Sequence, residues 1–408
     1  MKKLILISCL LITTSTISAQ QKVPVRMQMP EGKCEFLNNK TSTAIPFQII
    51  NNLIIIQIQL NGKAMNLVLD SGMPIDGIVL YGSSKVDSAK LSFTAKMPLG
   101  GVGGNAVLSD ACMGASFNIP DLSFSNQMIV VTPHDQDRSL HFEGQDGIIG
   151  FSFFGHLIVS IDYEKQLITV SQPGTINESD LGQRVPVEVR SNRIFVKSDV
   201  QLENGTTIPA ELIIDAGNGS ALNLNTGSSK DMSLPDKTIS YFARGLTGRI
   251  DRKIGRIKSI KIGGFQFNDV LSSFNDGSSA PPPPWAKEGD LGNEILRRFH
   301  ITFDIPNRQI FLKKNKSYTE SFEYTMAGIQ TERAADKNFI VINVISGSAA
   351  SRHLQAGDKI TKVNGKSSSQ ISKDELEKLF KNLGDEVSLV IERAGEKINT
   401  KLKLERII

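Results

Sequence analysis

Short runs of apolar and β-branched residues, separated by polar turns, make up most of the chain between about residues 45 and 315. Two turn signals, Asn61-Gly62 and Asn204-Gly205, each stand between two such runs, as in β-hairpins. Asparagine and glycine tolerate the backbone angles that tight turns require. The pattern predicts an all-β architecture in which each hairpin supplies the strand that leads to an aspartate, Asp70 or Asp215.

The chain repeats itself around these two aspartates. Asp70-Ser71-Gly72 and Asp215-Ala216-Gly217 each end an apolar run. Glycines follow both triplets at the same two offsets, 30 and 33 residues after each aspartate: Gly100 and Gly103, then Gly245 and Gly248. Further on, Gly147-Ile148-Ile149-Gly150 corresponds to Gly289-Asp290-Leu291-Gly292. These matched offsets indicate a duplicated unit of roughly 130 residues.

Paired carboxylates carry a specific chemistry. Two carboxyl groups held about 3 Å apart cannot both ionise, so they share one proton. The ionised member can take a proton from a water molecule while the protonated member polarises the carbonyl group that this water attacks. This chemistry requires no metal, cofactor or covalent intermediate. Because the titration belongs to the pair, the sequence assigns neither Asp70 nor Asp215 to a fixed role.

The two triplets and their crossing segments resemble those of the aspartic proteases, and the short, similar halves resemble fused copies of the retroviral-type half. The resemblance implies a two-lobed, pseudo-twofold all-β protein with catalytic residues Asp70 and Asp215 in the cleft between the lobes. It also implies that segments 148–150 and 290–292 cross behind the two loops. The residues that it assigns to the loops themselves are Ser71, Gly72, Ala216 and Gly217.

Two departures from the family pattern bear on activity. Ala216 lacks the hydroxyl group that would brace the facing loop, and losing one such hydrogen bond costs about 0.5 to 1.5 kcal/mol. Met73 and Asn218 follow the two glycines, where the family often has a hydroxyl-bearing or small residue, and we expect no donor to Asp70 from Met73. Two interpretations stay open: a working dyad, or an inactive cleft that only binds peptides.

Glycines mark the positions where this family places its flaps, the hairpins that close over substrate. The resemblance assigns flap and substrate contacts to these residues: Gly100, Gly101, Gly103, Gly245 and Gly248. Glycine suits a flap because it tolerates positive φ and lets a hairpin tip approach a peptide backbone. Ordinary glycine-rich hairpin turns are the alternative, and the shared offset of 30 residues favours flaps.

Beyond Lys316 the repeat ends, and the pattern becomes strand, strand, turn, strand, helix, strand, strand. The run Ala356-Gly357-Asp358-Lys359-Ile360, followed by Val363-Asn364-Gly365, resembles a bacterial PDZ domain. The resemblance implies a groove that takes a peptide C-terminus or an internal peptide as an added strand, with a helix at 373–383 as its wall. Its carboxylate-binding amides would come from Ala327, Gly328 and Ile329, after Met326. The alternative is a module that docks on the lobes and binds nothing.

The first residues have the features of a secretory signal peptide: Lys2 and Lys3, an apolar run from Leu4 to Ile12, and small residues up to Ala19. We therefore expect a secreted or periplasmic protein. Lipid anchoring at Cys9 is a less favoured alternative, because only a short apolar stretch precedes it. No later run approaches 18 consecutive apolar residues, so no transmembrane segment is expected.

Composition excludes several other classes. The 408 residues are 40% hydrophobic and 22% charged, and the net charge is only +4, with no basic patch interleaved with aromatic residues, so no nucleic-acid partner is expected. The five histidines do not have the spacing of metal ligands, which disfavours a metalloprotease. The sequence also has no Gly-x-Ser-x-Gly motif, which disfavours a serine hydrolase. Cys34 and Cys112 either form a disulfide or remain two free thiols. Asp162 and Asp304, before polar turns, are predicted to be turn formers.

The sequence thus predicts five parts: a signal peptide at 1–19, an N-terminal segment at 20–44, protease lobes at 45–180 and 181–316, and an α+β PDZ domain at 320–408. The predicted function is an aspartic endopeptidase that cleaves peptides or unfolded proteins recruited through the PDZ domain. A catalytically weak or inactive peptide-binding envelope protein is the alternative. Because both lobes belong to one chain, a monomer is expected to suffice. Trp285, after a run of prolines, is expected in a rigid surface loop or at the rim of the cleft.

Overall fold

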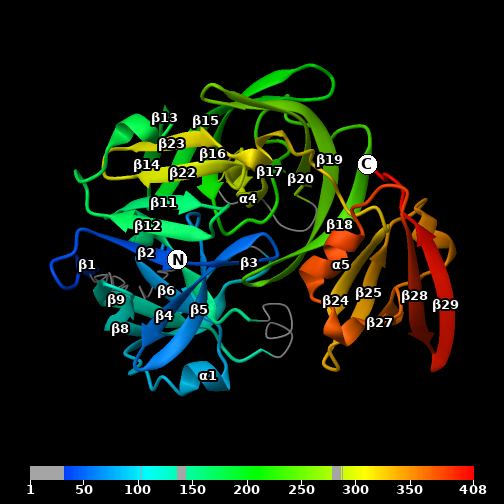
Figure 1. Cartoon of the computed structure of the whole chain (residues 1–408), viewed down its shortest axis with the longest axis horizontal. Helices are drawn as coiled ribbons and strands as arrows, with labels where there is room; N and C mark the ends of the chain where they lie inside the picture. The colour runs from blue at the N-terminus through cyan, green and yellow to red at the C-terminus, as the bar shows by residue number, and fades with distance from the viewer. Residues whose placement is uncertain (1–31, 102, 136–143, 278–285, 287) are drawn as a thin grey trace, which may run out of the picture.

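The computed structural model describes residues 32–101, 103–135, 144–277, 286 and 288–408. Within these ranges the chain folds into four β-sheets with a few short helices (Figure 1). The prediction of an all-β, two-lobed protein followed by an α+β module is confirmed. The predicted signal peptide, Cys9 and Trp285 lie outside the described residues.

The first lobe is built on a nine-stranded sheet of order β1-β9-β6-β10-β5-β4-β8-β7, with β3 paired to β4. Asn61 and Gly62 both have positive φ in the predicted turn between β4 and β5. The strands are β1 (Lys33–Phe36), β3 (Gln48–Ile50), β4 (Leu53–Leu60), β5 (Lys63–Leu69), β6 (Gly77–Leu80), β7 (Ala95–Leu99), β8 (Val107–Ile119), β9 (Leu122–Val131) and β10 (Gly147–Ile149).

The second lobe is built on an eight-stranded sheet of order β14-β15-β16-β21-β17-β20-β19-β18. The predicted hairpin around Asn204-Gly205 joins β15 to β16. The strands are β14 (Glu188–Arg190), β15 (Arg193–Gln201), β16 (Thr207–Asp215), β17 (Leu222–Asn225), β18 (Thr238–Gly245), β19 (Gly248–Ile262), β20 (Phe265–Asn275) and β21 (Gly289–Gly292).

Both lobes have the same strand topology. The strand that leads to an aspartate pairs in parallel with the strand that carries the crossing motif, β5 with β10 and β16 with β21. The crossing strand then pairs antiparallel with β6 or β17, which in turn pairs in parallel with β9 or β20. The sequence repeat is therefore a repeat of structure, and the two lobes face each other as copies of one unit.

A third, six-stranded sheet joins the lobes, with order β13-β23-β22-β11-β12-β2. Its two central strands, one from each lobe, pair antiparallel, and Ser160 bonds Thr302 across that junction at 2.9 Å. The phenyl rings of Phe154 and Phe303 pack edge to face where the lobes meet, 4.9 Å between centroids. The strands are β2 (Ser42–Pro46), β11 (Ile158–Asp162), β12 (Leu167–Ser171), β13 (Gln183–Pro186), β22 (Phe299–Asp304) and β23 (Gln309–Lys314).

The C-terminal module has its own sheet, of order β24-β25-β26-β28-β29 with β27 paired to β26. Helix α5 begins with a capping box between Ser372 and Glu375 and ends at Leu379, four residues before the predicted end, because Phe380 already leaves helical geometry. The strands are β24 (Ile329–Arg333), β25 (Phe339–Val344), β26 (Lys359–Val363), β27 (Lys366–Ser367), β28 (Glu386–Arg393) and β29 (Glu396–Lys403).

The helices of the described residues are short. Two of them, α3 and α4, directly follow the crossing strands β10 and β21 and so occupy equivalent places in the two lobes. The α-helices are α1 (Ser84–Asp87), α3 (Phe151–Phe154), α4 (Asn293–Leu296) and α5 (Lys373–Leu379), and the 3₁₀ turns are η1 (Glu178–Asp180), η2 (Lys316–Thr319), η3 (Ala349–Arg352) and η4 (Ser368–Gln370). Among the described residues, none of the helices is long and apolar enough to cross a bilayer.

The two cysteines of the described residues are free thiols. Cys34 lies in the edge strand β1, whereas Cys112 lies in β8. Strand β9 pairs with both and stands between them. Of the two alternatives, the structure therefore has the unpaired thiols, and burial raises the pKa of Cys34 to about 12, so that thiol stays neutral.

The connection from the second lobe to the C-terminal module is held by one buried arginine. The side chain of Arg298 is fully buried and forms an ion pair with Glu294 at 3.0 Å. Its guanidinium lies 3.8 Å from the ring centroid of Phe322. The same side chain donates to backbone carbonyls on both sides of the connection, those of Glu294, Ser317, Glu320 and Ser321.

We expect Arg298→Met to lower the free energy of unfolding by about 3 kcal/mol, because it removes the buried donor of four backbone carbonyls and one of the two arginine partners of Glu294. Urea unfolding followed by fluorescence measures the change, with the exposed Arg184→Met as the matched control. Equal unfolding midpoints for both variants would contradict this account of the connection.

Candidate active site between the lobes

The two aspartate loops meet at the junction of the lobes. Asp70 directly follows β5, and its backbone N–H donates to the carbonyl of Ile149 at 2.9 Å, so the crossing strand β10 fixes the start of the loop. Asp215 is the last residue of β16 and pairs with Gly292 of the crossing strand β21. The duplicated topology thus delivers one carboxyl group from each lobe to the same place.

The carboxyl groups of Asp70 and Asp215 face each other within reach of a hydrogen bond. Each one also lies over the glycine of the opposite loop. A methyl group added to Gly72 would come within 2.7 Å of Oδ1 of Asp215, and one added to Gly217 would overlap the carboxyl group of Asp70. Glycine is therefore required at both positions by the packing of the facing carboxyl group.

The two carboxyl groups differ in their surroundings. Asp70 accepts two backbone N–H groups, from Gly72 at 2.8 Å and Met73 at 2.9 Å, whereas Asp215 accepts one, from Gly217 at 2.9 Å. Our expectation that Met73 gives no donor to Asp70 is wrong, because its backbone N–H does so although its side chain cannot. These donors stabilise the ionised form of Asp70 more than that of Asp215.

Burial raises the pKa of both aspartates, and the two rises are unequal. The pKa of Asp215 lies well above its ordinary value because of burial and the negative charges of Asp70 and Asp290. The pKa of Asp70 is raised by burial but held down by its bond to Asp215, by its two N–H donors and by the charge of Arg193. The backbone donors and the nearby charges thus favour the ionised form at Asp70 and the protonated form at Asp215.

One hydroxyl group braces the two loops. Ser71 is fully buried and donates to the carbonyl of Ile214 at 2.7 Å, while it accepts the backbone N–H of Ala216 at 3.0 Å. Ala216 is equally buried but has no polar side-chain atom to return these bonds. Only the first lobe therefore contributes a side-chain hydroxyl to the hydrogen bonds between the two loops.

The predicted flap glycines lie at the tips of two hairpins, β7–β8 and β18–β19, and the tips touch. Thr247 donates to the carbonyl of Gly101 at 3.1 Å. Gly103 and Gly248 both have positive φ, and a methyl group on Gly248 would lie 2.7 Å from the carbonyl oxygen of Gly103. Gly100 lies beside this contact with open space around it, and Gly245 ends β18. These interlocked hairpins are more than ordinary turns, since each tip packs on the other lobe's tip.

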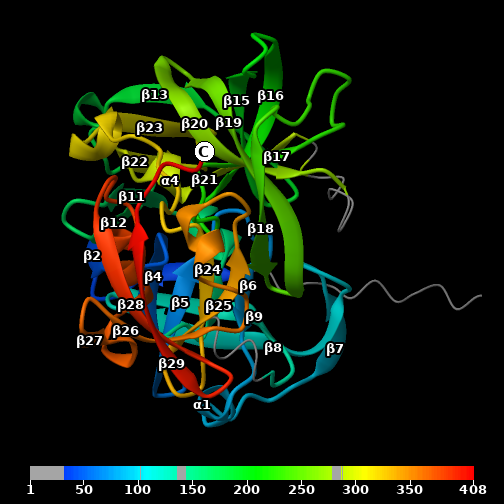
Figure 2. The same cartoon turned by 90° about the vertical axis from the view of Figure 1, so that its right-hand side faces the viewer.

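The face of the C-terminal module that carries β24 and α5 lies against the second lobe, beside the hairpin strand β18 (Figures 1 and 2). A cavity of about 360 Å³ lies between them, lined by Ile329 and Leu376 of the module and by Tyr241 and Ser220 of the lobe. The groove expected to hold a peptide thus opens towards the second lobe.

Two amide side chains of the module bond the free edge of β18. The amide of Gln330 accepts the backbone N–H of Phe242 at 3.0 Å and donates to its carbonyl at 3.3 Å. Asn343 donates to the carbonyl of Ser240 at 3.2 Å. Strands β18 and β24 are both edge strands of their sheets. The side-chain amides take the place of the backbone hydrogen bonds that two neighbouring edge strands could form with each other.

The residues predicted to bind a peptide carboxylate are buried. Ala327 and Gly328 directly precede β24, which begins at Ile329, and Met326 already donates its N–H to the carbonyl of Phe380 at 2.7 Å. A methyl group on Gly328 would meet the side chains of Ser348 and Ile407, so the end of the chain itself lies beside this loop.

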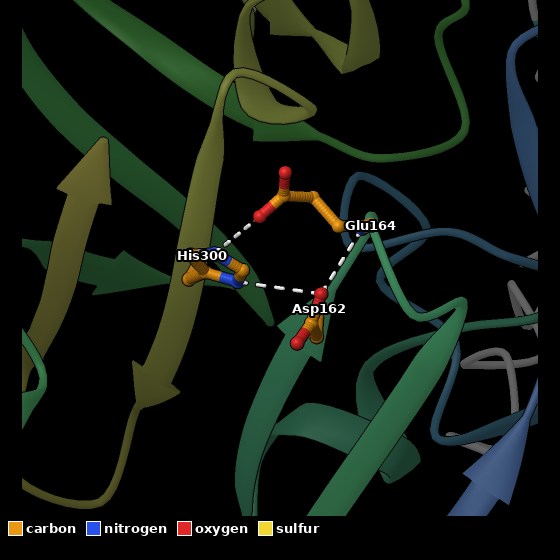
Figure 3. A group of neighbouring side chains, drawn as sticks. All are labelled: Asp162, Glu164 and His300. Carbon is orange, nitrogen blue, oxygen red and sulfur yellow. Dashed lines mark hydrogen bonds and ion pairs between the residues drawn. The ribbon is translucent and has the colours of Figure 1, made fainter. Parts of the chain in front are cut away.

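The spatial cluster of Asp162, Glu164 and His300 was not visible in the sequence, because His300 comes from the other lobe (Figure 3). The imidazole lies 3.4 Å from Asp162 and 3.0 Å from Glu164, one ring nitrogen to each carboxylate. Lys165 and Lys316 lie 3.5 Å from the same two carboxylates. With both ring nitrogens and both charges already balanced, the cluster is an ion-pair network at the lobe junction.

The two predicted turn formers act differently. The carboxylate of Asp162 accepts the backbone N–H groups of Glu164 at 3.0 Å and Lys165 at 2.9 Å, as expected. The buried carboxylate of Asp304 instead accepts side-chain amides, from Asn307 at 2.9 Å and Gln309 at 2.7 Å. The expectation that Asp304 bonds its own following backbone is therefore wrong for its side chain, because Asn307 of the turn and Gln309 at the start of β23 bind its oxygens instead.

Comparison with known proteins supports part of this picture. The family model of the PDZ domain matches residues 313–392. This part of the chain is a PDZ domain. No curated protein shows significant similarity to the chain. Among solved structures, an aspartic proteinase from Irpex lacteus aligns over 68% of this chain and 99% of its own, with 13% sequence identity and a TM-score of 0.44. A TM-score this low gives no support for the fold beyond the strand pairing described above.

We expect Asp215→Asn to be more stable than the wild type at pH 7 and to lose this advantage at low pH. The raised pKa means that folding favours protonated Asp215, so its contribution is fully present below the ordinary value of 3.8 and is lost as pH rises through the folded pKa. Asparagine removes this loss, and each pKa unit is worth about 1.4 kcal/mol. The free energies of unfolding of both proteins are measured at pH 3 and pH 7. A stability gain of Asp215→Asn that is equal at the two pH values would contradict the raised pKa of Asp215.

Proposed function

We propose that the chain is an aspartic endopeptidase in which Asp70 and Asp215 act as the catalytic pair. The observation that carries the proposal is the meeting of two partly buried carboxyl groups, one from each lobe, each packed over the glycine of the opposite loop. Surface or purely structural carboxylates have no reason to be brought together in this way, because burial and mutual repulsion both oppose it. The interlocked hairpin tips above the pair add the enclosure that peptide hydrolysis benefits from.

The chemistry follows from the unequal pair. Ionised Asp70 takes a proton from a water molecule between the carboxyl groups, while Asp215 gives its proton to the oxygen of the substrate carbonyl. The water oxygen forms a bond to the carbonyl carbon, which yields a tetrahedral diol. Asp70 then passes its proton to the amide nitrogen and Asp215 recovers one from a hydroxyl of the diol, so the C–N bond breaks and the pair returns to its starting state.

The remaining assignments complete the proposal. A PDZ domain binds peptides in the groove between its edge strand and helix, and we propose that it recruits peptide or unfolded substrates to the cleft. From the predicted leader we propose that the enzyme is secreted or acts in a periplasm. Since both carboxyl groups belong to one chain, the proposed active form is a monomer.

A second candidate function is favoured by the one-sided brace. Ala216 leaves the second lobe without the hydroxyl that would bond the first, which loosens the register of the two carboxyl groups. A chain with this site could hold peptides in the cleft and the PDZ groove without hydrolysing them. Activity assays on single-residue variants separate the two candidates.

We expect pepstatin-sensitive cleavage of unfolded protein between acidic and neutral pH, reduced at least 10³-fold in Asp70→Asn and in Asp215→Asn. Cleavage assays by mass spectrometry measure this, with Asp199→Asn, an exposed carboxylate of the second lobe, as control. The rate should be proportional to enzyme concentration, as expected of a monomer. A wild type without cleavage that still binds peptides would favour the second candidate.

We expect Ala216→Thr to cleave as fast as the wild type or faster, by up to about tenfold, because the added hydroxyl can bond the first lobe in the way that Ser71 bonds the second. Rates of peptide hydrolysis for Ala216→Thr and for the isosteric Ala216→Val measure the effect. A large fall in the threonine variant alone would show that the loops are not braced as described.

A further inference from the structure

A row of apolar residues crosses the sheet of the first lobe beside Asp70. Ile148 pairs with Val68 on β5 and with Val79 on β6, and Val79 pairs with Val130 on β9. Met73, three residues after Asp70, belongs to the same packed cluster. We call these four residues the apolar half-site: Met73, Val79, Val130 and Ile148.

The equivalent row of the second lobe is polar at every one of these positions. Asp290 pairs with Ile213 on β16 and with Asn223 on β17, and Asn223 pairs with Ser273 on β20. Asn218 stands three residues after Asp215. The polar half-site is therefore defined by matching strand registers, residue for residue: Asn218, Asn223, Ser273 and Asp290.

Both half-sites lie on the sheet face beneath the hairpin tips. Ile149 and Leu291 point into the main core, so the residues before them, Ile148 and Asp290, point to the opposite face. On that face of the first lobe, Leu99 and the tip residue Leu246 pack against the apolar cluster. The charge of Asp290 acts on Asp215, which places the polar half-site next to the proposed dyad.

The carboxylate of Asp290 retains binding capacity. Its Oδ1 accepts amide hydrogens from Asn218 at 2.6 Å and Asn223 at 3.1 Å, whereas Oδ2 has one long bond, from Asn223 at 3.4 Å. Within the described part of the chain, Asp290 has no ion-pair partner; Arg252 contributes only a longer-range charge. Burial raises its pKa to about 6, so at neutral pH the half-site carries a negative charge, and the cation that acts on it, Arg252, forms no ion pair with it.

We propose that the polar half-site binds a lysine or arginine side chain of the substrate directly beside the scissile bond, and that the apolar half-site takes an aliphatic side chain on the other side. This specificity rests on the proposed peptidase function. The repeat of the lobes places the half-sites equivalently on either side of the dyad. A cationic side chain gains a charge-assisted hydrogen bond to Oδ2 of Asp290, whereas a neutral chain of equal length leaves this carboxylate unpaired in a closed cleft.

Matched peptides test the proposal on the full-length protein. The set has leucine on one side of the scissile bond and lysine, norleucine or glutamate on the other, in both orders, and each peptide is also made with a reduced, non-cleavable bond for binding measurements. The proteins are the wild type, Asp290→Asn, Asp290→Ile, which copies Ile148, and the exposed control Asp199→Asn. Substitution of Asp290 also changes the dyad, but the ratio of two substrates at one pH cancels that effect.

We expect the wild type and Asp199→Asn to prefer lysine over norleucine by about 10- to 100-fold in kcat/KM, in one of the two orders only. Asp290→Asn should reduce this ratio at least tenfold, and Asp290→Ile should prefer norleucine. If no peptide is cleaved but the reduced-bond peptides show the same pattern in their Kd values, the binding specificity of the polar half-site is supported and the proposed peptidase function is not. A wild type without preference for lysine in cleavage or in binding, or a preference kept in both variants, overturns the proposal.

Discussion

The contact between Asp70 and Asp215 is the interaction on which the rest of the two-lobed structure depends. Bringing two carboxyl groups together in a largely buried site is unfavourable unless one keeps a proton and their remaining oxygens find donors. The loops meet both needs: backbone N–H groups of Gly72, Met73 and Gly217 donate to Oδ1 of the two carboxyl groups, which also face each other. The large apolar core and the sheet that joins the lobes supply the stability that such a contact consumes.

Duplication gave both lobes one topology but not one chemistry. Where the first lobe has Ser71, the second has Ala216, and where the first has Ile148, the second has Asp290. The two differences have separate effects. The Ser71 hydroxyl braces the loops from the first lobe only, and the negative charge of Asp290, present only in the second lobe, favours the protonated form of Asp215. A symmetric fold thereby holds an asymmetric pair.

Much of this could be read from the sequence, because it is encoded locally. Asn61-Gly62 fixes a hairpin turn by its own backbone preferences, and the repeated triplets and glycines fix which strands are equivalent. What the sequence did not reveal depends on tertiary contacts. The backbone N–H of Met73 is hidden behind an unsuitable side chain, and His300 reaches Asp162 only through the pairing of the two lobes. Asp290 was visible in the aligned repeat, but its effect on Asp215 needed a distance that only the fold provides.

The bonding of Gln330 and Asn343 to β18 has a consequence for the independence of the parts. An edge strand with free N–H and C=O groups is a template for pairing with other chains, and proteins usually protect such edges. Here the protection of the second lobe's outermost strand is supplied by another module through two side-chain amides. The PDZ domain is thus a structural cover for the second lobe, and a two-lobed fragment on its own would expose the unpaired N–H and C=O groups along the edge of β18.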